Sequence, residues 1–129
     1  MNGATSPTII KGKMILIVDD EKDVLELLKE LLSECKLDIA SSFEEAKNLL
    51  EAKFYDLAIL DIMGVRGYDL LEIANSMNIP ALMLTAHALS EEHLKRAFQE
   101  GAAYYAPKEE ISNIELFVAD VLEAKEKKK

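Results

Sequence analysis

Short runs of apolar residues alternate along the chain with longer segments in which apolar residues recur every three or four positions. The runs are rich in branched aliphatic residues, which is typical of strands that are covered on both faces of a parallel sheet. Each run is only a few residues long and is followed by a polar or turn-forming position. The pattern predicts strands at residues 14–18, 37–40, 57–60, 81–85 and 103–106.

The segments between these runs have the period of amphipathic helices. In the first of them, leucines at helical spacing predict a helix from Lys22 to about Cys35. Helix ends are indicated by side chains that can satisfy free backbone groups and by glycine, which tolerates a left-handed backbone. The residues expected to mark such ends are Ser42 with Glu45 as a capping box, Ser90 as an N-cap, and Gly101 as a C-terminal stop.

Five alternations of strand and helix predict a single α/β domain. Parallel neighbours need crossover connections, and these place helices on both faces of the sheet. We therefore expect a (βα)5 doubly wound, five-stranded parallel sheet over residues 14–125. Residues 1–13, which are small, polar and turn-forming, are expected to be a flexible leader, and residues 126–129 a lysine-rich tail.

Composition excludes several classes of function. The chain has 129 residues and a net charge of −9, and outside its lysine-rich tail it lacks the clustered basic residues that hold a nucleic acid backbone. It has no secretory signal and no apolar run long enough to cross a membrane. Its single cysteine, Cys35, cannot form an internal disulfide. These features predict a cytoplasmic protein that binds neither nucleic acid nor membrane.

Polar and charged residues follow four of the five predicted strands. Asp19 and Asp20 follow the first, Asp61 the third, and Lys108 the fifth, while Thr85 ends the fourth. The carboxyl ends of parallel strands meet at one edge of the sheet, where ligands bind. Carboxylates gathered there repel one another unless a cation lies among them, and oxygen ligands of this kind suit Mg²⁺. The pattern predicts a magnesium site with a nucleophilic aspartate.

Four motifs on these strand ends resemble the receiver domain of two-component response regulators. They are ILIVDDE (15–21), LAILDIM (57–63), LMLTA (82–86) and GAAYYAPK (101–108), and the resemblance extends over about residues 14–125. Each motif alone is weak, but their order along the chain is specific. The resemblance implies a flavodoxin-like fold with strand order 2-1-3-4-5. It also implies a signalling domain, with no enzymatic activity beyond its own phosphorylation and dephosphorylation.

The resemblance implies a role for each acid at the strand ends. Asp61 is similar in position to the aspartate that accepts a phosphoryl group, which a sensor histidine kinase or a histidine phosphotransfer protein would supply. Asp19 and Asp20 match the pair of acids that holds Mg²⁺, together with Asp61 itself. The backbone carbonyl of Met63 matches a further metal ligand.

The other matching residues would convert phosphorylation into a change of surface. Thr85 matches the hydroxyl that moves toward the phosphoryl group, and Lys108 matches the lysine that pairs with one of its oxygens. Tyr105 matches the aromatic residue that turns inward with the threonine. A downstream effector would then bind the face formed by the fourth helix, the fifth strand and the fifth helix, on a monomer or a phosphorylation-dependent dimer.

Three features concern the rim of the site, and the first two of them depart from the family pattern. The segment DIMGVRGYDLL (61–71), with Gly64 and Gly67, is about two residues shorter than usual, so the loop or the third helix should be shortened. Glu109 and Glu110 follow the lysine and would compete with phosphate for it. His87 follows the threonine by two positions and would tune the lifetime of the phosphoryl group.

Two other functions use similar residues. A Mg²⁺-dependent phosphatase of the haloacid dehalogenase type also has a nucleophilic aspartate at a strand end, but it needs a second acid where this chain has Met63. A phosphorylation-independent interaction module with receiver architecture is the main alternative. Such modules usually lack the acceptor or the metal-binding acids, and here all of them are present.

Overall fold

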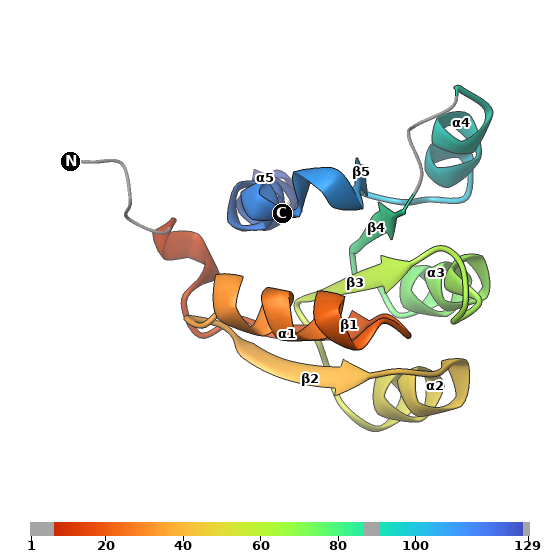
Figure 1. Cartoon of the computed structure of the whole chain (residues 1–129). Coiled ribbons are helices and arrows are strands. Elements are labelled where there is room, and N and C mark those ends of the chain that lie inside the picture. Colours follow the sequence, from red (N-terminus) through yellow and green to blue (C-terminus); the bar gives the residue numbers. More distant parts are fainter. Residues whose placement is uncertain (1–6, 87–90, 128–129) are drawn as a thin grey trace.

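A computed structural model describes residues 7–86 and 91–127 and shows one parallel sheet between two layers of helices (Figure 1). The strands are β1 (Met14–Val18), β2 (Lys36–Ala40), β3 (Leu57–Asp61), β4 (Ala81–Thr85) and β5 (Tyr104–Pro107). The helices are α1 (Lys22–Leu31), α2 (Phe43–Ala52), α3 (Gly67–Ser76), α4 (Glu91–Gln99) and α5 (Ile114–Lys127). Two short 3-10 helices, η1 (Thr8–Ile10) and η2 (Lys108–Asn113), precede β1 and α5.

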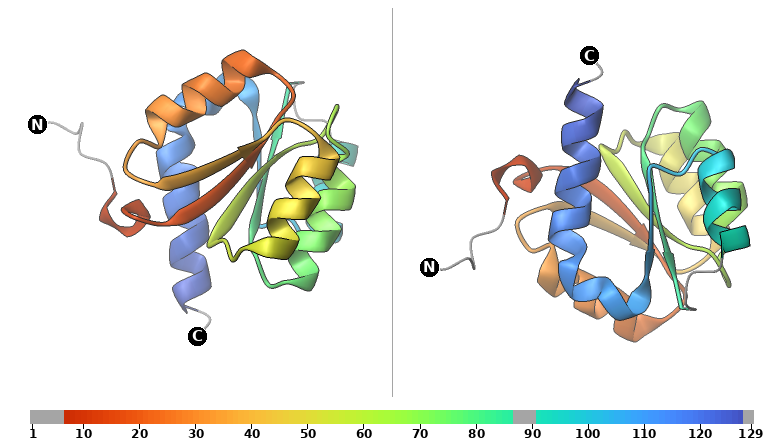
Figure 2. Two further views of the ribbon diagram at one scale, coloured as in Figure 1. Left: turned by 90° about the horizontal axis from the view of Figure 1, so that it is seen from below. Right: turned by 90° about the horizontal axis from the view of Figure 1, so that it is seen from above.

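The strand order is β2-β1-β3-β4-β5 and all neighbours are parallel, which confirms the fold expected from the sequence. The helices α1 and α5 cover one face, whereas α2, α3 and α4 cover the other (Figure 2). Each connection therefore crosses the sheet and brings the chain back parallel to itself. No helix among the residues described here has the length and hydrophobicity to cross a bilayer.

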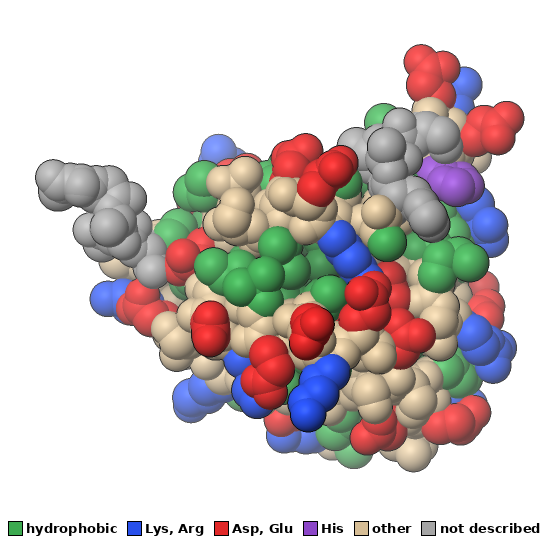
Figure 3. Space-filling model, viewed as in Figure 1, with side chains coloured by type: hydrophobic (Ala, Val, Ile, Leu, Met, Phe, Trp, Pro, Cys, Tyr) green, Lys and Arg blue, Asp and Glu red, His purple; other side chains and the backbone are tan. Residues whose placement is uncertain are grey.

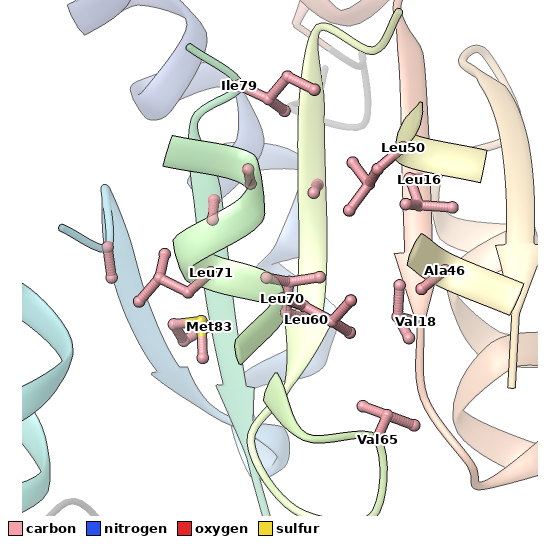
Figure 4. Close-up of a cluster of buried hydrophobic side chains, with 14 of the residues drawn as sticks. Leu16, Val18, Ala46, Leu50, Leu60, Val65, Leu70, Leu71, Ile79 and Met83 are labelled. Atoms are coloured by element: carbon pink, nitrogen blue, oxygen red, sulfur yellow. The ribbon is translucent and has the colours of Figure 1, made fainter. Parts of the chain in front are cut away.

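Two apolar cores lie on opposite faces of the sheet, because successive side chains of a strand point to opposite sides. In the core beneath α2 and α3, Leu50 of α2 lies beside Leu16 of β1 and Leu70 of α3 lies beside Leu60 of β3, and all four are fully buried (Figure 4). The strands β3 and β4 are buried along their whole length. This burial on both faces explains why their sequences are continuous apolar runs with no polar alternation.

Helix ends follow the expected signals where the structure describes them. The Ser42 hydroxyl accepts a hydrogen bond from the Glu45 backbone N–H at 3.2 Å, and Gly101 has the left-handed φ of 97° that a helix stop requires. The first helix ends at Leu31, earlier than the expected Cys35, because residues 32–35 turn into β2, which begins at Lys36. The predicted N-cap Ser90 lies outside the described residues.

The segment before β1 departs from the expected flexible leader. Residues 8–10 form η1, which packs against α5, and the Ile10 side chain is fully buried in the core between α1 and α5. The Cys35 thiol donates a hydrogen bond to the Ile10 carbonyl at 3.4 Å, and the Gly12 N–H donates to the Glu34 carbonyl at 2.8 Å. The packed part of the chain therefore begins before Met14.

Shortening the Ile10 side chain should measure how much this segment contributes to stability. Removing one buried methylene in Ile10→Val is expected to lower the free energy of unfolding by about 1 kcal/mol. The same change at Ile9, which is only partly buried, should have a smaller effect. Chemical denaturation of both variants makes the comparison, and equal small effects would show that η1 does not pack in solution.

Candidate functional site

The polar residues expected at the strand ends lie at one edge of the sheet. The strands are paired up to this edge, so the residue after one strand comes to lie beside the residue after its neighbour. The pairs nearest the edge are Val18 with Leu60, Asp61 with Leu84, and Thr85 with Pro107. In the space-filling view, acidic side chains gather beside a basic one where β1 runs into α1 (Figure 3).

Asp61 is the last residue of β3 and is buried, with 4% of its surface exposed. Burial raises the pKa of its carboxyl group to about 6, and the nearby charge of Asp19 adds to this shift. The ammonium group of Lys108 opposes the shift from 3.2 Å away. A buried carboxylate with raised pKa, next to a second carboxylate, is the electrostatic setting that a cation relieves.

Asp19 follows β1 and is the more deeply buried of the two, with 1% exposed. Burial raises the pKa of Asp19, while contacts with Lys108 and with the Glu21 backbone partly offset the effect. The Glu21 N–H donates to Asp19 Oδ1 at 2.8 Å, and Asp19 Oδ2 lies 2.9 Å from Lys108 Nζ. The orientation of the Asp19 carboxylate is therefore fixed from both sides.

Lys108 is the first residue of η2 and extends across the carboxyl ends of the strands. Its ammonium nitrogen lies 2.7 Å from Glu21 Oε1, in addition to its contacts with Asp19 and Asp61. Burial alone would lower the pKa of Lys108, but its contacts with Glu21 and Asp19 raise it well above the ordinary value. The lysine is a fixed positive charge at the centre of the site.

The ion pairs of Lys108 with described residues do not include the glutamates that were expected to compete for it. They go to Asp19, Glu21 and Asp61, and not to Glu109 or Glu110. Both of those glutamates lie in η2 with their side chains exposed. The glutamate that contacts Lys108 is instead Glu21, which lies near the opposite end of the sequence.

Asp20 is exposed and lies against the turn that follows β3. A Cβ atom at Gly64 would overlap the present position of the Asp20 carboxylate, and the φ of 83° at this point of the turn favours glycine. Met63 precedes this glycine, and its side chain is 67% exposed. The connection from β3 to α3 consists of residues 62–66, and α3 has ten residues, as many as α2.

The close fit continues at the start of α3. Arg66 has a left-handed φ of 56°, which is uncommon for a residue with a side chain. Gly67 follows it, and a Cβ atom at that position would overlap the backbone carbonyl oxygen of Asp61. The helix α3 therefore begins directly against the end of β3, and this packing sets the position of the Asp61 backbone.

Three carboxylates at this edge form a group that could hold a metal ion. Asp19, Asp20 and Glu21 each offer an oxygen within 4.8 Å of the others. Asp61 is not part of this group, although its pKa responds to the charges of Asp19 and Asp20. Carboxylate oxygens are ligands that suit a hard divalent cation such as Mg²⁺, and a cation here would also relieve the repulsion between Asp61 and Asp19.

Thr85 and Tyr105 lie on the neighbouring strands β4 and β5, and both are buried, with 4% and 5% of their surfaces exposed. Burial raises the pKa of the Tyr105 hydroxyl, and a contact with the Thr85 side chain opposes part of that shift. The tyrosine ring is therefore turned inward beside the threonine. His87, which was expected at the rim of the site, lies outside the described residues.

The protein-family model for the response regulator receiver domain matches residues 15–119 of this chain. The chain belongs to this family. Members of the family are signalling domains of two-component systems. The match begins with β1 and ends within α5, so it includes every residue of the site described above.

Similar proteins agree with this assignment. The chain is 33% identical over 113 residues to the two-component response regulator ARR18 of Arabidopsis thaliana, a match that covers 80% of this chain and 18% of that protein. A two-component response regulator from Clostridium difficile has a TM-score of 0.73 at 30% identity, covering 84% of this chain and 92% of the other. A CheY-like receiver domain protein from Methanospirillum hungatei has a TM-score of 0.71 at 26% identity, covering 88% and 99%.

The structure adds residues that the sequence alone did not identify as parts of the site. Glu21 stands in the acidic run ILIVDDE, yet nothing in the run indicates that it contacts a residue 87 positions away. Gly64 and Gly67 indicate an unusual loop in the sequence, but the sequence does not show which atoms lie close to them. In this receiver domain, the connection from β3 to α3 brings Gly64 against Asp20 and Gly67 against Asp61.

Proposed function

We propose that this receiver domain is phosphorylated on Asp61 in a reaction that depends on Mg²⁺. The observation that supports it is the buried Asp61 carboxylate, which lies 3.2 Å from Lys108 Nζ. Asp19 and Asp20 lie at the same edge of the sheet, directly after β1. Asp19, Asp20 and Asp61, with the backbone carbonyl of Met63, would hold the metal ion. The ion supplies positive charge for the phosphoryl oxygens when it is bound.

The reaction transfers a phosphoryl group to an Asp61 carboxylate oxygen. That oxygen attacks phosphorus, a P–O bond forms, and the bond between phosphorus and the donor nitrogen breaks. The donor is a phosphohistidine of a sensor kinase or of a phosphotransfer protein, and its imidazole leaves with the bonding electron pair. Lys108 neutralises charge on one phosphoryl oxygen, and the Thr85 hydroxyl donates a hydrogen bond to another.

A change of surface would follow from the change of charge. The acyl phosphate carries between about one and a half and two negative charges at neutral pH, in place of the single charge of the Asp61 carboxylate. Thr85 is drawn toward these charges. The Tyr105 ring, which lies inward beside it, then fills the space that the Thr85 side chain leaves. The face formed by α4, β5 and α5 then favours a different set of partners.

Exposed apolar side chains support this face as the one that effectors bind. Phe98 on α4 is 51% exposed, and Leu116 on α5 is 58% exposed. On the same elements, Tyr104 of β5 stacks on Phe117 of α5 with ring centroids 4.9 Å apart. Aromatic side chains such as Phe98 are enriched at the centres of protein interfaces.

The experiment that tests phosphorylation is incubation with acetyl phosphate and Mg²⁺, followed by intact mass measurement. A gain of one phosphoryl group, roughly 80 Da, is expected with Mg²⁺ and should disappear when EDTA is added, because the attacking and transferred oxygens would then repel one another. A wild-type protein whose mass does not change with either acetyl phosphate or a phosphorylated kinase would favour the phosphorylation-independent interaction module.

A phosphatase of the haloacid dehalogenase type is less well supported. Its second acid would stand two positions after the nucleophile, where Met63 presents an exposed thioether. A thioether neither accepts nor donates a proton at neutral pH. The site therefore lacks the general acid that release of an alcohol from a phosphate ester requires.

A further inference from the structure

Glu21 differs from the other two carboxylates that contact Lys108. Asp61 is the proposed phosphoacceptor, and Asp19 is a proposed metal ligand. Glu21 is the N-cap residue of α1, and its side chain is 55% exposed at the rim of the site. Its contact with the ammonium group is nevertheless the shortest of the three, at 2.7 Å against 2.9 Å and 3.2 Å.

The position of Lys108 depends on this contact. The lysine side chain is only 11% exposed, and Asp61 lies on the inner side of the site, whereas Glu21 is largely open to solvent. The backbone of Glu21 is itself held, because its N–H donates to Asp19 Oδ1. The glutamate therefore reaches the ammonium from a fixed point on the rim.

We propose that Glu21 restrains Lys108 in the unphosphorylated state and competes with the phosphoryl group for it. This inference rests on the proposed phosphorylation of Asp61. Glu21 acts through Lys108 and is thus a positioning residue, which lowers the fraction of protein that is phosphorylated at a given donor concentration.

Competition follows because the phosphoryl oxygens lie farther from the Asp61 backbone than the carboxylate oxygen that Lys108 contacts. In the unphosphorylated protein three carboxylates lie around the three N–H donors of Lys108. The ammonium group must shift toward a phosphoryl oxygen, and this shift lengthens its 2.7 Å contact with Glu21. Of the three carboxylates, Glu21 loses least by releasing Lys108, because water can replace the ammonium group at the rim. Its release still costs part of the free energy of an exposed ion pair.

A ligand role for Glu21 is the alternative that the geometry raises. Its carboxylate lies within 4.8 Å of oxygens of Asp19 and Asp20, so a metal ion could in principle use all three. The contact with Lys108 argues against it, since a carboxylate that pairs with a neighbouring ammonium is less available to a metal. The two roles give opposite results when the charge of Glu21 is removed.

The test is the affinity of the domain for beryllofluoride, a stable mimic of the phosphoryl group, measured by calorimetry at saturating Mg²⁺. The protein contains no tryptophan, so calorimetry replaces intrinsic tryptophan fluorescence. Glu21→Gln is expected to bind beryllofluoride about threefold more tightly than wild type, the size expected for one exposed ion pair. At a low concentration of acetyl phosphate, it should also be phosphorylated to a greater extent.

Two further variants separate the contact from the charge. Glu21→Asp keeps the charge but shortens the side chain, so it should behave like Glu21→Gln if the contact with Lys108 matters. Glu109→Gln removes a charge from an exposed position next to Lys108, and it should bind beryllofluoride like wild type. The proposal is overturned if Glu21→Gln equals wild type, or if Glu21→Asp does.

Magnesium binding gives an independent outcome. If Glu21→Gln weakens Mg²⁺ binding by more than about tenfold, the size expected for the loss of a metal-site residue, then Glu21 is a ligand and the restraint on Lys108 is rejected. Wild-type protein that binds no beryllofluoride would reject the proposed function itself, and the inference with it. Normal wild-type binding with unchanged Glu21 variants would reject the inference alone.

Discussion

Asp61→Asn should abolish the phosphoryl mass gain that acetyl phosphate and Mg²⁺ produce, and in the absence of metal it should raise the stability of the protein at neutral pH. The amide cannot act as the nucleophile, so no acyl phosphate forms. It also carries no charge, and the folded protein disfavours a charge at this position because the site is buried and Asp19 lies nearby. Loss of function and gain of stability are thus two results of one substitution.

The size and pH dependence of the gain follow from the pKa of Asp61. That pKa is about 6 in the folded protein in place of 3.8, and about 1.4 kcal/mol per unit gives about 3 kcal/mol above pH 6. Because the folded pKa is the higher one, wild-type stability falls as the pH rises from about 4 to about 6. The advantage of Asp61→Asn should therefore vanish below about pH 4, where both proteins are neutral at this position.

Urea denaturation in EDTA at several pH values measures this difference. Asp120→Asn is the matched control, since it makes the same chemical change at an exposed position of α5. It should keep the mass gain and change stability by less than about 0.5 kcal/mol. A mass gain that persists in Asp61→Asn would place the phosphoryl group on another residue, and a variant less stable than wild type would contradict the electrostatic account.

Gly67→Ala should lower the free energy of unfolding by about 3 kcal/mol, the upper part of the range for forcing atoms into a packed region. The added Cβ would overlap the Asp61 carbonyl oxygen, a main-chain atom that cannot move away as a flexible side chain would. The end of β3 must then shift, so we also expect slower phosphorylation by acetyl phosphate.

Gly12→Ala provides the comparison for backbone strain alone. Gly12 has a left-handed φ of 72°, but a Cβ atom there would meet nothing within 4 Å. Gly12→Ala should lower the free energy of unfolding by about 1 kcal/mol and leave phosphorylation unchanged. Thermal and urea denaturation of the two variants give the contrast. Equal losses at both positions would show that the close approach of α3 to β3 is not what makes Gly67 necessary.

The sequence predicted the sheet well because local patterns determine it. Strands β3 and β4 are continuous apolar runs, and the structure buries them along their whole length. The stop at Gly101 was predictable for a similar reason, since few residues adopt a left-handed φ readily. The grouping of the polar residues at one edge of the sheet could be predicted from the topology, because the carboxyl ends of all parallel strands lie at that edge.

Features that depend on distant contacts could not be predicted. The contact of Glu21 with Lys108 joins residues 87 positions apart, and no local period indicates it. Ile10 looked like part of a polar leader, yet the space between α1 and α5 accepts its side chain. The left-handed Arg66 has no sequence signal either, because it is imposed by a loop that must turn within few residues.

The buried position of Ile10 affects where this protein can be cut. A truncation designed from the start of β1 would begin at Met14 and remove Ile10. The apolar surface that this residue covers, shared by α1 and α5, would then face water. Such a shortened protein should be more prone to aggregate during purification, so expression vectors for this domain should retain the residues from Pro7 onward.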